Sequence, residues 1–121
     1  MQVPLQITIR GIASSEALEK RIRDKAENFD KFFNHITSCR ILVEEPHKHH
    51  HQGKQFNVRI DISVPGHEIV VNHDHHEDVY VALRDAFNAA RRQLEDYVQQ
   101  LRGNIKAHET KHLDKHAGQF Q

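Results

Sequence analysis

The stretch Gln55-Phe56-Asn57-Val58-Arg59-Ile60-Asp61-Ile62-Ser63-Val64 carries the clearest pattern in this sequence. Its apolar and polar side chains alternate strictly, which is the period of a β-strand. One side of the strand is therefore buried and the other faces water, as in an antiparallel sheet that is covered on one side only. This pattern predicts a two-layer fold with helices on a single face of a sheet.

The segments on either side of this strand extend the predicted sheet. Pro65-Gly66 predicts a turn, and residues 69–71 then form the second strand of a hairpin. Residues 37–45 alternate as another strand, and residues 5–9 as a fourth near the N-terminus. In the 37–45 strand Cys39 shares a face with Ile41 and Val43, so we expect its thiol in the core and not as a reactive group.

Two segments have the helical period instead. Apolar residues recur every three or four positions from Leu18 to Phe33, which predicts a helix that begins at Ser14 or Ser15 and ends near residue 34. A longer helix is predicted up to Gly103, with Asp74 as its N-cap and Glu77 three residues later completing a capping box. Residues 104–121 lose the period and are predicted to form a flexible C-terminal tail.

These elements predict an α+β fold in the order β-α-β-β-β-α. A helix joins the first two strands, so they should be parallel, whereas the last three strands form an antiparallel meander. The result is a four-stranded mixed sheet with two helices packed on one face. We expect one domain over residues 1–103, followed by the tail at 104–121, and a chain of 121 residues with 37% hydrophobic residues suits one modest core.

The composition excludes several classes of protein. Lys plus Arg and Asp plus Glu number 17 each, so any affinity for nucleic acid must come from a local patch and not from bulk charge. A single cysteine favours a reducing compartment. No apolar run is long enough to span a membrane and the N-terminus has no secretory signal, so we expect a cytoplasmic protein without membrane contacts. No phosphate-cradling loop or nucleophile motif is present, which argues against an enzyme and against a cofactor.

Three local strings resemble one protein family. They are His76-Glu77-Asp78-Val79-Tyr80 at the start of the last helix, Arg92-Gln93-Leu94 within it, and Asp24-Lys25 with Asp30-Lys31-Phe32 in the first helix. Together with the order of elements over residues 3–103, they resemble the ribosome hibernation promoting factor and protein Y family. Its members are ribosome-associated translation inhibitors, also described as sigma-54 modulation proteins.

The resemblance implies a non-catalytic stress-response factor that binds the small ribosomal subunit. Its partner would be 16S rRNA in the mRNA and tRNA channel, and bound factor would block translation. The chain departs from the family in two ways: several members carry excess positive charge, and long members add a C-terminal dimerisation domain. We therefore expect a short-form member that is a monomer when free.

Cations on the two predicted helices are the candidates for contacts to rRNA. They are Lys20, Arg21, Lys25 and Lys31 in the first helix, and Arg84, Arg91, Arg92 and Arg102 in the last. Guanidinium forks suit phosphate oxygens, but spacing alone favours ordinary solvated faces with pairs such as Arg91–Glu95. The resemblance favours Lys25, Lys31 and Arg92. For Tyr80, at the border of the apolar face, packing is favoured over stacking on RNA.

The 12 histidines are the second unusual feature of the sequence. One cluster follows the 37–45 strand and another follows the 69–71 strand, and both should emerge at the same edge of the sheet. A metal site made of His49, His51, His73 and His75 is therefore the alternative function, although their spacing matches no established motif. For these histidines, a place in solvated polar loops is favoured over a metal site. A third interpretation is a charge role, in which protonation of the histidines would raise RNA affinity as pH falls from about 7.5 to 6. A protein adaptor using the open strand edges is a further reading.

Overall fold

The computed structural model has the element order that the sequence predicts. It describes residues 4–13, 15–45, 55–76 and 78–113, with the backbone alone for 74–76 and 104–113. The elements are β1 (Leu5–Arg10), α1 (Glu16–Phe32), β2 (Ser38–Glu44), β3 (Phe56–Val64), β4 (His67–His76) and α2 (Val79–Leu113).

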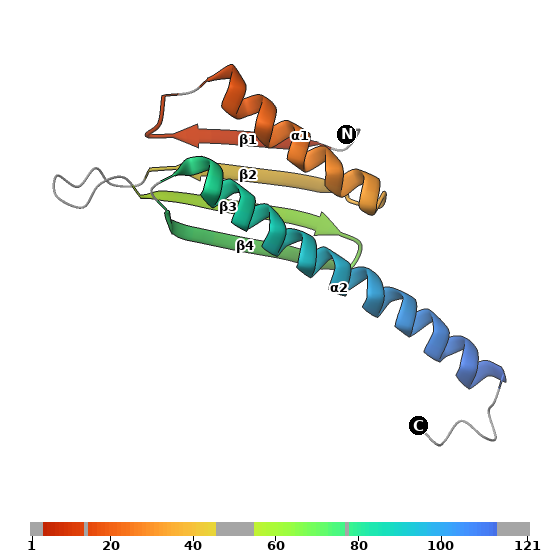
Figure 1. The fold of residues 1–121 in the computed structure, drawn as a ribbon. Helices are drawn as coiled ribbons and strands as arrows, with labels where there is room; N and C mark the ends of the chain where they lie inside the picture. Colours follow the sequence, from red (N-terminus) through yellow and green to blue (C-terminus); the bar gives the residue numbers. More distant parts are fainter. Residues whose placement is uncertain (1–3, 14, 46–54, 77, 114–121) are drawn as a thin grey trace.

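The four strands form one sheet in the order β1-β2-β3-β4. β1 is parallel to β2, with Ile7 opposite Ile41, whereas β2–β3 and β3–β4 are antiparallel. Both helices lie on the same face of this sheet (Figure 1). The predicted α+β class, strand directions and helix layer are therefore confirmed.

The core lies between the sheet and the two helices. The inward residues of β3 are Val58, Ile60 and Ile62, and all three are fully buried. The helices add Leu18, Ile22, Ala26 and Phe29 from α1, and Leu83, Ala86, Ala90 and Leu94 from α2. The α1–α2 contact itself is centred on Phe29 and Phe87, whose rings stack with centroids 5.4 Å apart.

The end of β1 needs a glycine. Gly11 has φ +72°, and a Cβ at this position would lie 2.7 Å from the backbone oxygen of Glu45. The chain is held there by the amide of Glu45, which donates to the oxygen of Arg10 at 3.1 Å. Only glycine fits this turn without strain, so the end of β1 falls where the sequence predicts it.

The start of α2 differs from the prediction. The stretch 73–76 is not a loop, because β4 continues to His76 along nearly the whole length of β3, past an irregularity between Phe56 and Val58. The helix therefore begins later, and Asp78 is its N-cap: its Oδ1 accepts the amide of Tyr80 at 2.8 Å. The predicted cap at Asp74 is wrong. At α1 the predicted cap is right, since the Ser15 hydroxyl accepts the amide of Leu18 at 3.0 Å.

The end of α2 also differs, because the helix does not stop near Gly103. It continues to Leu113 and runs past the end of the sheet (Figure 1). A glycine inside a helix costs only about 1 kcal/mol, and no proline follows to end it. The flexibility predicted for 104–121 stays a prediction, and residues 114–121 lie outside the described ranges.

The buried face of β3 gives a first testable prediction. Ile60→Asp would place an unpaired carboxylate at a fully buried position and should abolish cooperative unfolding, as measured by circular dichroism in urea. Asn72→Asp is the control, because it introduces the same carboxylate at an exposed position of the neighbouring strand, opposite Arg59. The free energy of unfolding of the control should stay within about 1 kcal/mol of the wild-type value. Cooperative unfolding of Ile60→Asp would contradict this account of the core.

A second prediction concerns pH. Burial, with a smaller contribution from the Asp61 carboxylate, raises the pKa of the Cys39 thiol to about 12. The unfolded thiol ionises near its ordinary pKa of about 9, so unfolding releases a proton between these values. Stability should thus fall as pH rises above 9, by about 1.4 kcal/mol per pH unit from this group. In urea titrations between pH 8 and 10.5, the free energy of unfolding of Cys39→Ala should fall less steeply with pH than that of the wild type. An equal slope in the two proteins would refute the raised pKa of Cys39.

Candidate nucleic-acid interface

Helices α1 and α2 run side by side in the same direction and meet along one flank each (Figure 1). We call this contact line the α1–α2 seam. It is formed by Arg21, Lys25 and Phe32 from α1, and by Tyr80, Phe87 and Arg91 from α2. The helical period places Arg84 on the same flank of α2. Cations on one flank of each helix therefore lie along this shared line.

Three cations bridge the seam by lying over aromatic rings of the other helix. The Arg21 guanidinium carbon lies 5.1 Å from the centroid of the Tyr80 ring. The Lys25 nitrogen is 6.0 Å from the Phe87 ring, and Arg91 of α2 lies 5.7 Å from the ring of Phe32. Such contacts contribute about 0.5–1 kcal/mol each at exposed sites. They order the cations in a row while leaving their charges in water.

Two of these rings are exposed to solvent. Phe32 is 40% exposed and Tyr80 is 39% exposed, whereas Phe87 is buried beneath them in the core. The sequence assigns Tyr80 to packing at the border of the apolar face. Its ring is in fact open to water on the outside of the seam, with Arg21 as its neighbour.

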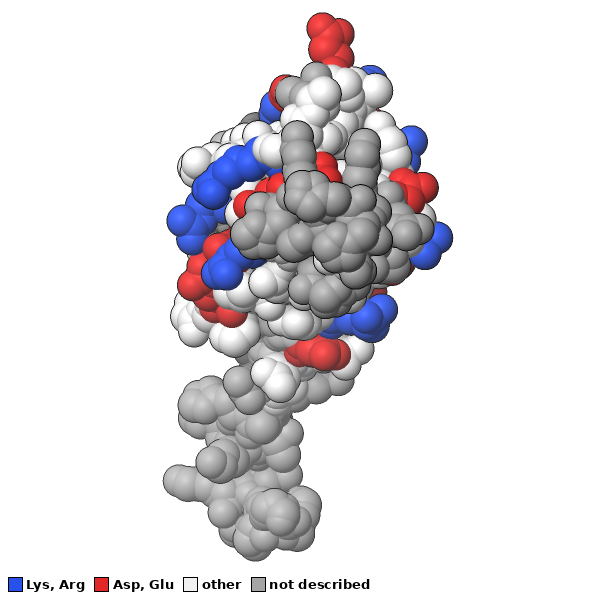
Figure 2. All heavy atoms as spheres, turned by 90° about the vertical axis from the view of Figure 1, so that its left-hand side faces the viewer, with Lys and Arg blue, Asp and Glu red and all other residues white. Residues whose placement is uncertain are grey.

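Carboxylate partners are described for Lys20, Arg84 and Arg91 among the predicted cations. Lys20 binds Asp24 at 3.1 Å, Arg84 binds Asp85 at 3.2 Å, and Arg91 binds Glu95 at 3.3 Å. All three pairs lie on single helices, and the predicted Arg91–Glu95 pair is confirmed. Figure 2 looks along the sheet from the end where both helices begin, and among the residues that it colours basic and acidic groups are interspersed.

The structure does not bring all eight predicted residues together. Arg21, Lys25, Arg84 and Arg91 share the seam. Lys20 and Lys31 lie on the outward surface of α1 and Arg92 on that of α2, since each is about 80° or more further round its helix. Arg102 is exposed, but it lies eleven residues after Arg91, or about 16 Å beyond the level of Phe32.

A second group of arginines lies on the open face of the sheet, and no pattern in the sequence singles it out. Arg40 and Arg59 bind the two oxygens of Asp61 at 3.2 and 3.1 Å, and Asp61 is only 8% exposed. Arg40 also lies 3.8 Å from Glu68. A shallow pocket of about 190 Å³ borders this network and is lined by Arg10 as well. These arginines stabilise a buried carboxylate, so they are less available to a ligand than those of the seam.

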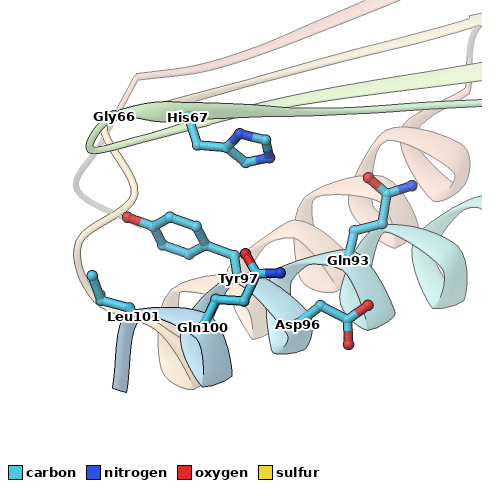
Figure 3. A pocket seen from close by; sticks show the side chains of 7 residues that line it. All are labelled: Gly66, His67, Gln93, Asp96, Tyr97, Gln100 and Leu101. Carbon is cyan, nitrogen blue, oxygen red and sulfur yellow. The ribbon is translucent and has the colours of Figure 1, made fainter. Parts of the chain in front are cut away.

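A larger pocket, of about 440 Å³, lies between α2 and the β3–β4 turn (Figure 3). Its wall contains Tyr97, whose hydroxyl donates to the oxygen of Pro65 at 2.8 Å and whose ring stacks on His67. The remaining side chains are Gln93, Asp96, Gln100 and Leu101, with no Lys or Arg among the residues that line it. The pocket therefore does not extend the cationic seam.

The predicted metal site is mostly outside what the structure describes. His49 and His51 fall in 46–54, and only the backbone is described for His75. The described side chains contain no group of three or more His, Cys, Asp or Glu that could hold a metal. His73 is half-buried on the helix-covered face, opposite Val58. The alternative function as a metal-binding protein remains a prediction without a described ligand set.

This fold, with two helices side by side on a four-stranded mixed sheet, defines a small α+β domain with a cationic helix seam. The chain belongs to the family described as sigma 54 modulation protein / S30EA ribosomal protein, whose model matches residues 5–102. The resemblance inferred from the local strings is thereby confirmed. Within the described ranges, no helix has the length and apolar character needed to cross a membrane.

Individual relatives agree with this assignment. The chain is 24% identical over 92 residues to a ribosome hibernation promotion factor from Deinococcus radiodurans, covering 76% of this chain but 47% of that protein. It thus spans about half the length of that curated relative. Its fold is similar to that of a ribosomal subunit interface protein from Coxiella burnetii (TM-score 0.66, 18% identity, covering 80% of this chain and 99% of that one). It is also similar to the N-terminal domain of Protein Y from Thermus thermophilus (TM-score 0.65, 15% identity, 78% and 99% covered).

Proposed function

We propose that this protein is a translation-silencing factor that binds the small ribosomal subunit through the α1–α2 seam. In this proposal the seam contacts 16S rRNA in the mRNA and tRNA channel, and the protein acts by occupancy and not by catalysis. The observation that carries the proposal is the row of cations that both helices direct into one seam. The description of the family as a ribosomal protein, and the name of the curated relative, support the ribosome as the partner.

The carboxylates beside the seam do not prevent phosphate binding. Glu95 and Arg91 have side chains that are 41% and 60% exposed, and exposed i,i+4 pairs contribute only about 0.3–0.5 kcal/mol. A guanidinium–phosphate contact is a charge-assisted bond with two parallel donors, which is stronger. Rotation of the exposed Glu95 side chain into water would therefore leave Arg91 available to RNA at little cost.

The neutral charge of the chain fits a local contact. With 17 basic and 17 acidic residues, long-range attraction to RNA is weak, and non-specific binding should be weak too. Binding then depends on the few cations that reach phosphates together. The number of those contacts can be measured from the salt slope, which is the decrease in the logarithm of the binding constant per unit increase in the logarithm of the salt concentration. Each phosphate that a cation neutralises releases counterions and adds about 0.9 to this slope for a duplex.

Co-sedimentation of the purified protein with ribosomal subunits on sucrose gradients tests this function. We expect the protein to travel with the small subunit at 50 mM salt and to be released at 500 mM salt, because phosphate contacts weaken as salt rises. Addition of the protein to a cell-free translation reaction should lower its output. Failure to bind small subunits at low salt would overturn the proposal.

Charge reversal separates the seam from other helix surfaces. Lys25→Glu should weaken small-subunit binding by about tenfold or more, since it replaces a seam cation by a carboxylate. Arg23→Glu is the matched control, because Arg23 is an exposed cation on the opposite flank of the same helix. The control should bind within about twofold of the wild type. Equal losses in both variants would show that the seam is not the interface.

The resemblance also favours Arg92, which lies outside the seam. Arg91→Gln and Arg92→Gln therefore compare two neighbouring arginines with the same change of charge. If the seam is the interface, Arg91→Gln should lower the salt slope of binding by about 1 and Arg92→Gln should leave it unchanged. The reverse result would move the interface to the outward surface of α2.

A further inference from the structure

The exposed rings of the seam add little to the stability of the fold, because their cation–π contacts to Arg21 and Arg91 contribute only about 0.5–1 kcal/mol each. Phe32 and Tyr80 each keep about two fifths of their surface in water. The α1–α2 contact is already made by the stacked rings of Phe29 and Phe87 underneath. A leucine at either position would cover the same apolar border and would favour the helix more strongly. Aromatic rings at these two positions therefore point to a use outside the fold.

Each exposed ring has a guanidinium group beside it. Arg21 lies over Tyr80 and Arg91 lies over Phe32, with cation-to-centroid distances of 5.1 and 5.7 Å. A flat ring next to an arginine is the arrangement that binds one unpaired nucleotide, since the ring stacks on the base and the cation reaches its phosphate. The seam presents this arrangement twice, once toward each end.

We propose that the seam binds single-stranded RNA, with unpaired bases stacked on Phe32 and Tyr80. Arg91 and Arg21 would then turn from the rings to the adjoining phosphates, and Lys25 and Arg84 would contact the backbone between them. This inference rests on the proposed function and specifies its partner: the rRNA or mRNA segment at this surface is unpaired.

The spacing of the rings sets the length of the segment. Tyr80 lies level with Arg21, and Phe32 is eleven residues further along α1, so the rings are about 16 Å apart along the helix axis. One base cannot touch both rings. The bound segment is therefore several nucleotides long, with its backbone following the seam between them.

Double-stranded RNA fits these features less well. Its bases are stacked on one another, and it offers proteins mainly phosphates and 2′-hydroxyls. A duplex on the seam could use the cations, but it would leave both rings in contact with its sugars or with water. The rings thus distinguish two partners that the cations alone do not.

Fluorescence anisotropy with two labelled probes tests the proposal on the full chain. The probes are an unstructured 12-nucleotide RNA and the blunt duplex of the same sequence. We expect the wild type to prefer the single strand. Phe32→Leu and Tyr80→Leu should each weaken single-strand binding by about 5- to 100-fold, while binding of the duplex changes less than twofold. Val70→Ala, which removes exposed apolar surface from β4, is the control and should bind like the wild type.

The salt dependence distinguishes stacking from lost charge. Loss of a stacked base lowers affinity without changing the number of phosphate contacts, so the leucine variants should keep the wild-type salt slope. A lower slope, or equal weakening for both probes, would mean that the substitutions had displaced Arg21 or Arg91, and it would overturn base stacking.

Tyrosine emission gives a direct readout. The chain has two tyrosines and no tryptophan, so Tyr97→Phe leaves Tyr80 as the only strong fluorophore. Saturating single-stranded RNA should quench Tyr80 in this variant, and the duplex should not. No quenching at concentrations that saturate anisotropy would refute stacking on Tyr80.

The two proposals fail separately. If leucine variants bind small subunits and single strands like the wild type, the stacking proposal is wrong while ribosome binding stands. If the wild type binds the single strand but no ribosomal subunit, the proposed function is wrong.

Discussion

One constraint organises this molecule: the sheet has a single apolar face, so both helices must cover that face together. The polar alternation of β3 leaves the opposite face to Arg59 and Asp61. The directions of the strands then fix those of the helices. β1 and β4 run the same way, because β1 is parallel to β2 and two antiparallel pairings separate β2 from β4. Each is followed by a helix, and α1 and α2 consequently start at the same end of the sheet (Figure 1).

Two parallel helices on one face bring equivalent flanks into contact in the same order along the chain. Arg21 of α1 meets Tyr80 of α2 near their starts, and Phe32 meets Arg91 near the end of α1. Each cation thus finds a ring on the other helix. Had the helices run in opposite directions, the order of these partners would be reversed and Arg21 would lie near Arg91. The seam therefore depends on sheet topology as much as on helix sequence.

Much of the fold could be predicted from the sequence, because alternation in β2 and β3 and the helical period of α1 are strong local signals. The errors lie at the ends of α2. Residues 73–76 contain mostly histidine, which does not favour strand over loop, and only pairing with β3 extends β4 through them. Gly103 looks like a helix end in sequence, but a single glycine is too weak to stop a helix.

The candidate site was predictable only in part. Helix periodicity correctly puts Arg21 with Lys25 and Arg84 with Arg91, each pair on one flank. It cannot say that these flanks face each other, because that depends on the order and direction of the packed helices. It also could not identify Phe32 as part of the site, since an aromatic residue beside an apolar stripe is normally assigned to the core. Exposure of its ring becomes visible only when the partner helix is in place.

The two arginine groups of this protein show why pairing with a carboxylate does not by itself remove a cation from function. On the open sheet face, Arg40 and Arg59 hold a carboxylate whose side chain is 10% exposed. If these two arginine side chains turned to a ligand, the Asp61 carboxylate would be left buried without a cationic partner, which is energetically costly. At the seam, the partner of Arg91 is 41% exposed and regains its hydration when the pair opens. The two groups of cations therefore differ in their availability, and the burial of the anion decides which group can exchange its partner for RNA.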